Sequence, residues 1–182
     1  MRVEPLTPER WGDFVDLFMR PGPRGGKGLA ANGCWCMWWR GRGRSHEQNR
    51  EAMERLVHEG RAPGLLAYDD RIPVGWVSVD RRENYVGLMR SRDYRPIDDE
   101  DGIWSVTCLF VHGADRRRGI GDLLVEEAIA HAFERGATAI EAYPMSPGKR
   151  NDYMGSFSRY ARLGFVPVRE AGVRTLVRLV RA

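Results

Sequence analysis

Residues 103–124 read IWSVTCLFVHGADRRRGIGDLL, and this stretch decides the fold. Its first nine residues, Ile103 to Val111, form a nearly continuous run of apolar and β-branched side chains, which is typical of a strand buried on both faces. A helix is predicted to follow as far as about Arg135, because apolar side chains recur along one stripe and Gly136 can end it. The stretch therefore predicts a buried strand that leads through a basic turn into a long helix.

The turn between this strand and this helix, RRRGIG at residues 116–121, has the composition of an anion-binding site. The first backbone N–H groups of a helix have no partner within the helix, and the helix dipole adds positive charge there, so a pyrophosphate fits this end. Gly119 and Gly121 lack Cβ atoms where the backbone must approach phosphates closely. The Walker pattern is absent, and the dinucleotide pattern G-x-G-x-x-G fails because its third glycine would fall on Leu124.

The rest of the chain interleaves predicted strands and helices, without an internal repeat or a low-complexity linker. Ser45 and Gln48 form a capping box that predicts a helix as far as about Gly60, and apolar spacing after Thr7-Pro8 predicts another helix. Further strands are predicted over residues 1–6, 63–68, 72–79, 138–143, 165–169 and 173–180, with short helices over 86–92 and 152–163. This order predicts one domain over residues 1–182 with a mixed sheet and a parallel crossover.

Two markers in this order resemble the GNAT family of N-acetyltransferases. Their signature [QR]-x-x-G-x-[GA] matches RRRGIG at 116–121, and their Tyr four residues before Gly-Phe matches Tyr160 in YARLGF. The resemblance covers roughly residues 103–168. It implies an α/β (α+β) fold with a mixed, mostly antiparallel central sheet flanked by helices and a parallel crossover at the acetyl-CoA site. It further implies that residues 1–100 shape the acceptor site and that residues 101–182 bind acetyl-CoA.

The resemblance also implies roles for individual residues. Backbone amides of the turn would bind the pyrophosphate of the cosubstrate acetyl-CoA, and the strand edge before it would pair with the pantetheine arm. Tyr160 would protonate the departing CoA thiolate as general acid. The implied acetyl-CoA-binding residues are Leu109, Phe110, Val111, Arg116, Arg117, Arg118, Gly119, Ile120, Gly121 and Asp122.

The sequence departs from the family pattern in two places. Tyr153 stands where many members carry Asn, and residues 102–114 contain no carboxylate that could serve as a general base. Water could relay the proton to Glu100, Asp101 or His112, or the amine could arrive neutral, and the sequence leaves these alternatives open.

The acceptor itself is expected to be a primary amine of a small molecule or peptide that attacks the thioester directly. The segment GCWCMWWR at residues 33–40 offers Trp35 and Trp38 as ligand-stacking faces, although aromatic side chains grouped in sequence also pack as core. Ser105 on the central strand and Tyr143 at the end of the next strand are the other candidates for this pocket.

Composition narrows the partners. The net charge of +4 favours an anionic ligand only weakly, and acetyl-CoA phosphates already account for the basic run, so no nucleic-acid partner is expected. The three cysteines, Cys34, Cys36 and Cys108, lack the paired spacing of a four-ligand zinc site, and no metal is predicted. A non-catalytic acyl-CoA sensor is the alternative function, and a nucleic-acid-binding module is less favoured.

The length of the apolar runs bears on location. None approaches the roughly 20 residues that span a bilayer, and the N-terminus lacks the apolar core of a secretory signal. We therefore expect a cytoplasmic protein without a membrane partner, present as a monomer or a homodimer.

Overall fold

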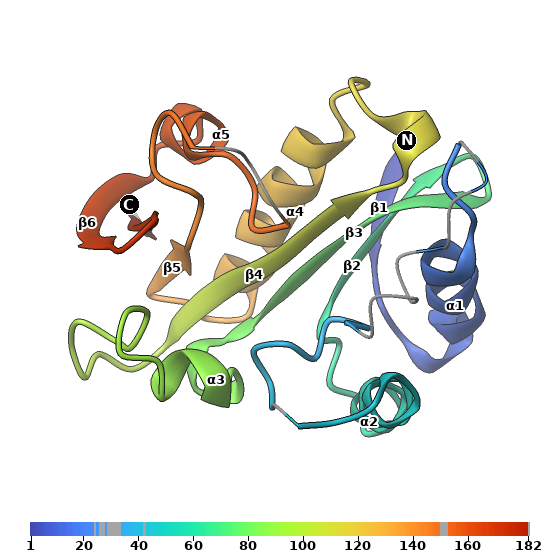
Figure 1. The fold of residues 1–182 in the computed structure, drawn as a ribbon, viewed down its shortest axis with the longest axis horizontal. Coiled ribbons are helices and arrows are strands. Elements are labelled where there is room, and N and C mark those ends of the chain that lie inside the picture. Colours follow the sequence, from blue (N-terminus) through green and yellow to red (C-terminus); the bar gives the residue numbers. More distant parts are fainter. Residues whose placement is uncertain (24, 26–27, 29–33, 42, 150–152, 182) are drawn as a thin grey trace.

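A seven-stranded sheet with helices on both faces forms the body of the chain in a computed structural model (Figure 1). The structure describes residues 1–23, 25, 28, 34–41, 43–149 and 153–181. The strands are β1 (Arg2–Pro5), β2 (Gly64–Asp69), β3 (Ile72–Arg81), β4 (Ile103–Val111), β5 (Ala139–Ala142), β6 (Val166–Ala171) and β7 (Arg174–Val180). The helices are α1 (Trp11–Met19), α2 (His46–His58), α3 (Val86–Met89), α4 (Ile120–Glu134) and α5 (Phe157–Arg162), with short 3-10 turns at Pro8–Arg10, Arg82–Asn84 and Gly113–Asp115.

The strands lie in the order β1-β2-β3-β4-β5-β7-β6. Every neighbouring pair is antiparallel except β4 and β5, which run parallel and are joined through α4. The predicted fold class, a mostly antiparallel mixed sheet with one parallel crossover, is thereby confirmed.

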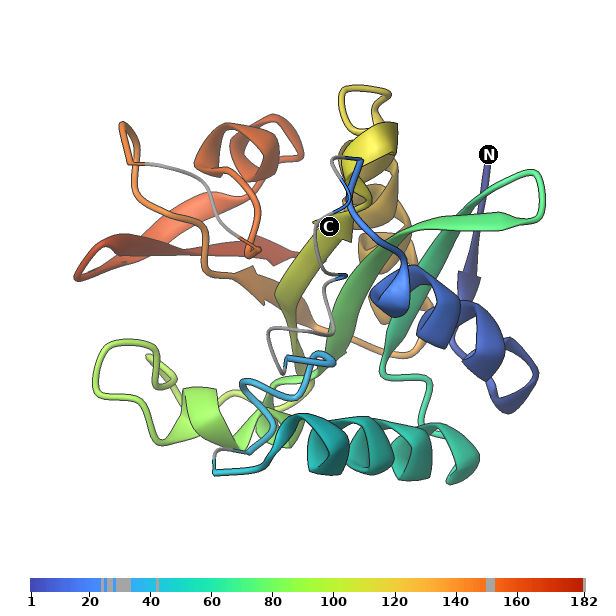
Figure 2. The ribbon, with the colours of Figure 1, turned by 45° about the vertical axis from the view of Figure 1, so that its right-hand side comes forward.

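The sheet separates two apolar layers (Figure 2). On one face, α4 packs Leu124, Val125 and Ala128 against the central strands, and Tyr160 of α5 joins this cluster. On the other face, α1 and α2 cover the β2–β4 region, with Phe14 and Met53 among the side chains buried there. Each strand in the middle of the sheet is therefore covered from both sides, as the apolar run of β4 predicts.

The two parallel strands separate part of the way along β4. Their pairing extends from Ile103 opposite Ala139 to Val106 opposite Ala142 and then stops. At the same place the ladder between β3 and β4 shifts register, which leaves Thr107 as an extra residue in β4. A bulge bends and twists the strand that carries it, so the second half of β4 loses its neighbour on the β5 side. This unpaired edge positions the candidate site.

The predicted elements match the observed ones with one clear exception. The helix predicted over 152–163 begins only at Phe157, where the Ser156 side chain accepts a hydrogen bond from the Arg159 amide as an N-cap. Residue 152, the predicted first residue, lies outside the described residues, whereas Tyr153 to Ser156 form turn and bridge structure. Within the described part of the chain, no helix is long and apolar enough to cross a membrane.

Candidate active site

The turn before α4 has the backbone of an anion-binding nest. Arg117 adopts φ +67° and Gly119 φ +79°, so two residues with left-handed backbone stand on either side of Arg118, which is not left-handed. Such alternation turns successive N–H groups toward one side, and the free N–H groups at the start of α4 follow directly. Left-handed φ is unfavourable for a residue with a Cβ, and Arg117 holds it at this turn next to a helix N-terminus.

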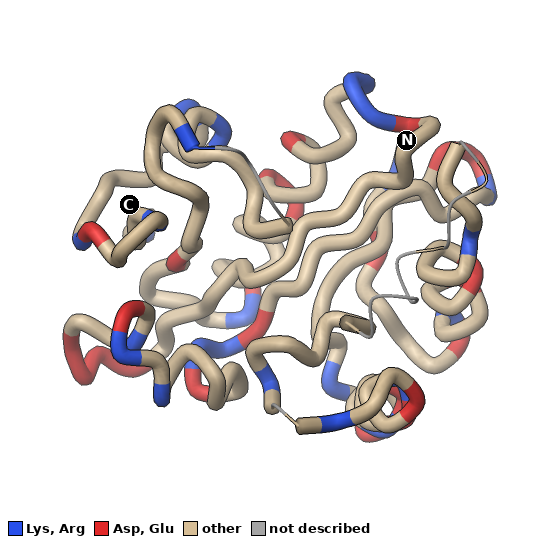
Figure 3. The backbone as a smooth tube through the Cα atoms, in the orientation of Figure 1, with Lys and Arg blue, Asp and Glu red and all other residues tan. Residues whose placement is uncertain are grey.

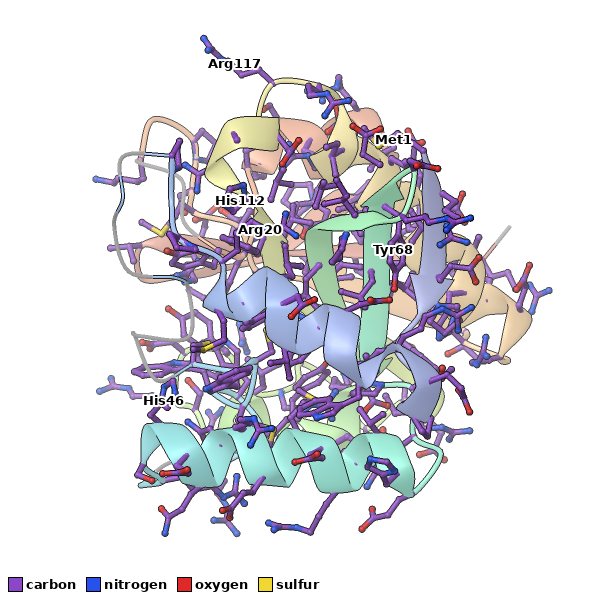
Figure 4. The ribbon with its side chains drawn as sticks, turned by 90° about the vertical axis from the view of Figure 1, so that its right-hand side faces the viewer. Met1, Arg20, His46, Tyr68, His112 and Arg117 are labelled. Carbon is purple, nitrogen blue, oxygen red and sulfur yellow. The ribbon has the colours of Figure 1, made fainter. Side chains whose placement is uncertain are left out.

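The three arginines of the turn have different partners. Arg118 pairs with Asp69 at 2.7 Å and with Asp115 at 2.8 Å, so its charge is engaged away from the helix N-terminus. Arg116 donates from Nε to the carbonyl of Val111 at 3.2 Å. Figure 3 shows the basic run as one continuous segment before α4, and Figure 4 shows the Arg117 side chain extending away from the body of the molecule. Arg117 is thus the arginine of this turn placed to meet an incoming anion.

A cavity of about 710 Å³ opens between this turn and the unpaired edge of β4. That volume lies within the usual range for small-molecule sites. Its wall contains nine of the ten residues predicted to bind acetyl-CoA, and Arg118 is the one absent from it. The lining residues are Leu109, Phe110, Val111, Asp115, Arg116, Arg117, Gly119, Ile120, Gly121, Asp122, Tyr153, Gly155, Ser156 and Arg159. We call this space the turn cavity.

Asp122 and Arg159 join α4 to α5 at the floor of the turn cavity. Partial burial opposes ionisation of Asp122, but hydrogen bonds and charge from Arg159 and Arg162 outweigh it and lower the pKa of this carboxyl. A Cβ on Gly121 would lie 2.9 Å from the Arg159 guanidinium. The helix start and this ion pair are therefore packed closely, and a side chain at position 121 would require the Arg159 guanidinium to shift.

Tyr160 is fully buried beneath a short segment that runs over it. Its hydroxyl donates to the carbonyl of Met154 at 3.1 Å. A Cβ on Gly155 would come within 3.0 Å of the Tyr160 ring, and Gly155 has φ +82°. The ring itself meets Phe165 edge-on at 5.1 Å between centroids. Packing and a hydrogen bond thus hold the phenol in one position.

The same segment also reaches β4. The carbonyl of Tyr153 accepts a hydrogen bond from the Leu109 amide at 2.5 Å, on the unpaired edge of the strand. Two consecutive carbonyls, of Tyr153 and Met154, therefore occupy the amide of Leu109 and the hydroxyl of Tyr160. Sequence reasoning missed this segment because a strand-edge contact to a distant loop leaves no local pattern.

A second cavity of about 320 Å³ lies on the other side of this segment, and Tyr153 lines both. We call it the thiol cavity, because all three cysteines of the chain contribute to its wall. Its lining residues are Cys34, Cys36, Trp38, Trp39, Thr107, Cys108, Tyr153, Met154 and Arg174. Thr107 and Cys108 both reach it although they are neighbours on β4, as the bulge at Thr107 allows.

The four predicted acceptor residues are placed differently. Trp38 is 59% exposed and lines the thiol cavity. Trp35 is buried in the α1–α2 layer, where it stacks on Phe18 and its indole N–H donates to the His46 ring. Ser105 and Tyr143 are buried below the cavities and hydrogen-bond to each other at 3.2 Å. Neither is among the residues that line a cavity.

A buried carboxylate lies next to Ser105, on the neighbouring strand. Glu141 of β5 pairs in register with Ser105, is fully buried, and accepts a hydrogen bond from Tyr143 at 3.0 Å. Arg178 at 2.6 Å and Arg82 at 3.4 Å bind it as well. It lines neither cavity, and its contacts describe a structural ion-pair cluster.

The other proton acceptors considered from the sequence are distant or engaged. Glu100 and Asp101 precede the start of β4, and at about 3.3 Å per residue the strand carries Leu109 roughly 20 Å from Ile103. His112 shares a hydrogen bond with the carbonyl of Pro21 at 3.0 Å. Among the described residues, no group of three or more His, Cys, Asp or Glu side chains is arranged to hold a metal ion.

Comparisons with known proteins show the family and the fold. Residues 32–165 match the family model described as the acetyltransferase (GNAT) family. The GNAT domain of S. lividans PAT is similar with a TM-score of 0.62 at 17% identity, over 99% of this chain and 90% of that one. A ribosomal-protein-alanine N-acetyltransferase from Brucella melitensis gives 0.59 at 15% identity over 100% of both chains. PaiA N-acetyltransferase from Thermoplasma acidophilum, in complex with coenzyme A, gives 0.52 at 13% identity over 99% and 98%. No curated protein matches the sequence.

Proposed function

The chain belongs to the acetyltransferase (GNAT) family, and from that premise we propose that it transfers an acetyl group from acetyl-CoA to a primary amine by direct attack. The family and the shared fold make it an acyl-CoA-dependent N-acetyltransferase. The identity of the donor, the class of acceptor and the residue roles below are our proposal. The two cavities that meet at Tyr153 are the observation that carries it.

The turn cavity suits the charged end of acetyl-CoA. The nest at Arg117 and Gly119, the helix start behind it and the outward guanidinium of Arg117 offer three kinds of anion binding in one place. The unpaired edge of β4 around Leu109 offers backbone groups that an amide-bearing pantetheine arm can match as an added strand. Residues 101–182 supply all of these groups, and we assign them the acetyl-CoA half of the domain.

The amide of Leu109 and the hydroxyl of Tyr160 supply the chemistry in this proposal. Attack on a thioester builds negative charge on the carbonyl oxygen, and a positioned amide stabilises that charge. The Leu109 amide is held by β4 next to the turn cavity, where it now binds the Tyr153 carbonyl. The thioester oxygen therefore has to replace the Tyr153 carbonyl at the Leu109 amide when acyl-CoA binds. If the same movement breaks the hydrogen bond between the Tyr160 hydroxyl and the Met154 carbonyl, the hydroxyl can protonate the thiolate.

The amine is proposed to enter from the thiol cavity. Trp38 and Trp39 provide apolar faces there, and Arg174 provides a cationic side chain that also donates to the Tyr143 carbonyl at 3.0 Å. With Glu141 held in its ion-pair cluster, the attacking amine is proposed to arrive neutral and to lose its second proton to solvent. Residues 1–100 contribute the loop with these indoles and so shape the acceptor side.

Two neighbouring arginines provide a matched test of the donor site. Arg117→Ala should weaken CoA binding about two- to fivefold, the effect of one exposed charge contributing about 0.5–1 kcal/mol. Arg118→Ala should leave it nearly unchanged, because Arg118 is engaged by Asp69 and Asp115 and does not line the cavity. Isothermal calorimetry with CoA measures both, and equal effects would contradict the assigned cavity.

Turnover needs a separate measurement. Acetyl-CoA is incubated with a panel of primary amines and peptides, and loss of thioester absorbance is followed. Acetylation of at least one amine by a protein that binds CoA supports the proposal. CoA binding without turnover of any amine would instead favour the acyl-CoA sensor.

A further inference from the structure

The three cysteines of the chain come together at one wall, although Cys108 is more than seventy residues from the other two. The sulfur atoms of Cys36 and Cys108 lie 3.4 Å apart, and both side chains are buried. Cys34 is half-buried and faces the same cavity. Nothing in the acetyl-transfer reaction uses these thiols, so their grouping calls for another explanation.

Cys34 is held as a reactive thiol. A hydrogen bond from the Cys36 thiol, joined by the backbone N–H groups of Cys36 and Trp38, lowers the pKa of Cys34 to about 7 against the opposing effect of burial. Trp35 and Cys36 both have positive φ, at 28° and 54°, and the Met37 amide closes this tight turn on the Cys34 carbonyl. This turn brings the amides of Cys36 and Trp38 to the Cys34 sulfur.

Cys36 has the opposite character. Burial raises the pKa of Cys36 well above its ordinary value, and contacts with the other two sulfur atoms add to this. Cys36 therefore remains a protonated thiol between two others. An accessible thiolate next to a protected thiol is the arrangement of redox-sensitive cysteine pairs.

We propose that the wall of the thiol cavity is a peroxide-modified site in which Cys34 is oxidised first and a Cys36–Cys108 disulfide is the product. The Cys34 thiolate attacks hydrogen peroxide, forming an S–O bond and breaking the O–O bond, and hydroxide leaves. The Cys36 sulfur then attacks Cys34, the S–O bond breaks, and the Cys36 proton leaves with the hydroxide as water. Two electrons have passed from the two sulfurs to the peroxide.

In the last step, thiol–disulfide exchange converts the Cys34–Cys36 disulfide into one between Cys36 and Cys108 of β4. Cys108 attacks the Cys36 sulfur and gives its proton to the hydroxide released in the first step, which becomes the second water. Cys34 leaves as a thiolate, because the thiol of lower pKa is the better leaving group. The Cys36 and Cys108 sulfurs need to close from 3.4 Å to about 2.0 Å, and Cys36 lies in a turn, outside the helices and strands. The net change is two thiols and one peroxide to one disulfide and two waters.

The product would tie the loop of residues 34–40 to β4 across the cavity wall. Both sulfurs line the space that we assign to the amine, so oxidation should raise the KM for the acceptor and spare that for acetyl-CoA. This consequence rests on the proposed function, whereas the thiol chemistry does not.

The test follows thiols directly, without substrate. The full-length protein is treated with equimolar hydrogen peroxide at pH 7, quenched with iodoacetamide, and analysed by intact mass and peptide mapping. Wild type should form a Cys36–Cys108 disulfide and keep one alkylated thiol at Cys34. Cys34→Ser should form the same disulfide at least about tenfold more slowly. At pH 7 about half of the Cys34 side chains are thiolates, and the variant lacks this nucleophile.

Two further variants intercept the intermediates. Cys36→Ser should accumulate the Cys34 sulfenic acid, which dimedone captures, and Cys108→Ser should stop at a Cys34–Cys36 disulfide. Circular dichroism of each untreated variant checks that it is folded. Equal oxidation rates in wild type and Cys34→Ser, or a wild-type product that contains Cys34 in its disulfide, would overturn the relay. An unchanged acceptor KM after proven disulfide formation would refute only the assigned acceptor cavity.

Discussion

Replacing Tyr160 by Phe removes one hydroxyl from a fully buried side chain and leaves the ring in place. Two effects follow from the structure and can be separated. The Met154 carbonyl loses the hydrogen bond that it accepts at 3.1 Å, and a buried group left without a partner costs about 1–3 kcal/mol of folding free energy. The ring contacts with Phe165 persist, so no cavity term is added.

The catalytic effect has a different size and origin. A positioned general acid contributes about 10²–10⁴-fold to the rate. The leaving thiol has a pKa near 8.5 and departs fairly well without a proton, so the lower end applies. We therefore expect kcat to fall about 10²-fold in Tyr160→Phe, while affinity for acetyl-CoA changes little. The kcat/KM of the wild type should rise with pH as the acceptor amine loses its proton, because no side chain of β4 takes that proton.

Tyr68→Phe is the matched control. Tyr68 is also buried and donates its hydroxyl to Asp13 at 2.7 Å, but it lies on β2 in the other apolar layer. It should lose a similar amount of stability in urea unfolding and keep its kcat. The readout is loss of thioester absorbance, since a thiol reagent would also label Cys34. Full activity of Tyr160→Phe, or an equal loss in Tyr68→Phe, would refute the acid role.

Two other predictions concern tryptophan and histidine. Trp38→Ala should raise the acceptor KM and leave CoA affinity and stability nearly unchanged, whereas Trp35→Ala should cost about 3–5 kcal/mol of unfolding free energy, which calorimetry and denaturant unfolding distinguish. Burial, helped by the charge of Arg135 and opposed by Asp80, lowers the pKa of His131 to about 4. Between pH 6.5 and 4, His131 is therefore protonated in the unfolded chain but neutral in the folded one. As pH falls through this range, the unfolding free energy should decrease by roughly 3 kcal/mol on account of His131. The difference between wild type and His131→Gln isolates this slope, and identical slopes in both would show that the histidine is not buried neutral.

The elements that the sequence predicted well are those whose signals are local. The apolar run of β4 and the stripe of α4 each reflect burial of one element, and their bounds agree closely with the structure. The capping box of Ser45 and Gln48 is likewise formed by four neighbouring residues, and both of its hydrogen bonds are present. The turn cavity followed from the same local signals, because its wall is mostly one strand end and one helix start.

The features that escaped prediction depend on contacts between distant residues. The grouping of Cys108 with Cys34 requires a bulge in β4, since simple alternation would not bring both Thr107 and Cys108 to one cavity. The choice between Trp35 as core and Trp38 as cavity wall depends on a tight turn that the spacing of the tryptophans in the sequence does not reveal. Glu141 was not predicted because it lies on β5, and only its pairing with Ser105 brings this buried carboxylate next to β4.

The position of Glu141 bears on how this site can work without a base on β4. Its carboxylate is bound by Arg82, Arg178 and Tyr143 and lines neither cavity, so we do not assign it the role of base. Two hydrogen-bond donors remain beside the segment of Tyr153 and Met154, and both are bound to its carbonyls. The Leu109 amide belongs to the wall of the turn cavity, whereas the Tyr160 hydroxyl is buried under the segment and lines neither cavity. Because a single segment covers both donors, a ligand that displaces it exposes them together. Under the proposed function, catalysis would therefore depend on oriented donors that act on the thioester, and the acceptor amine would have to arrive with a free electron pair.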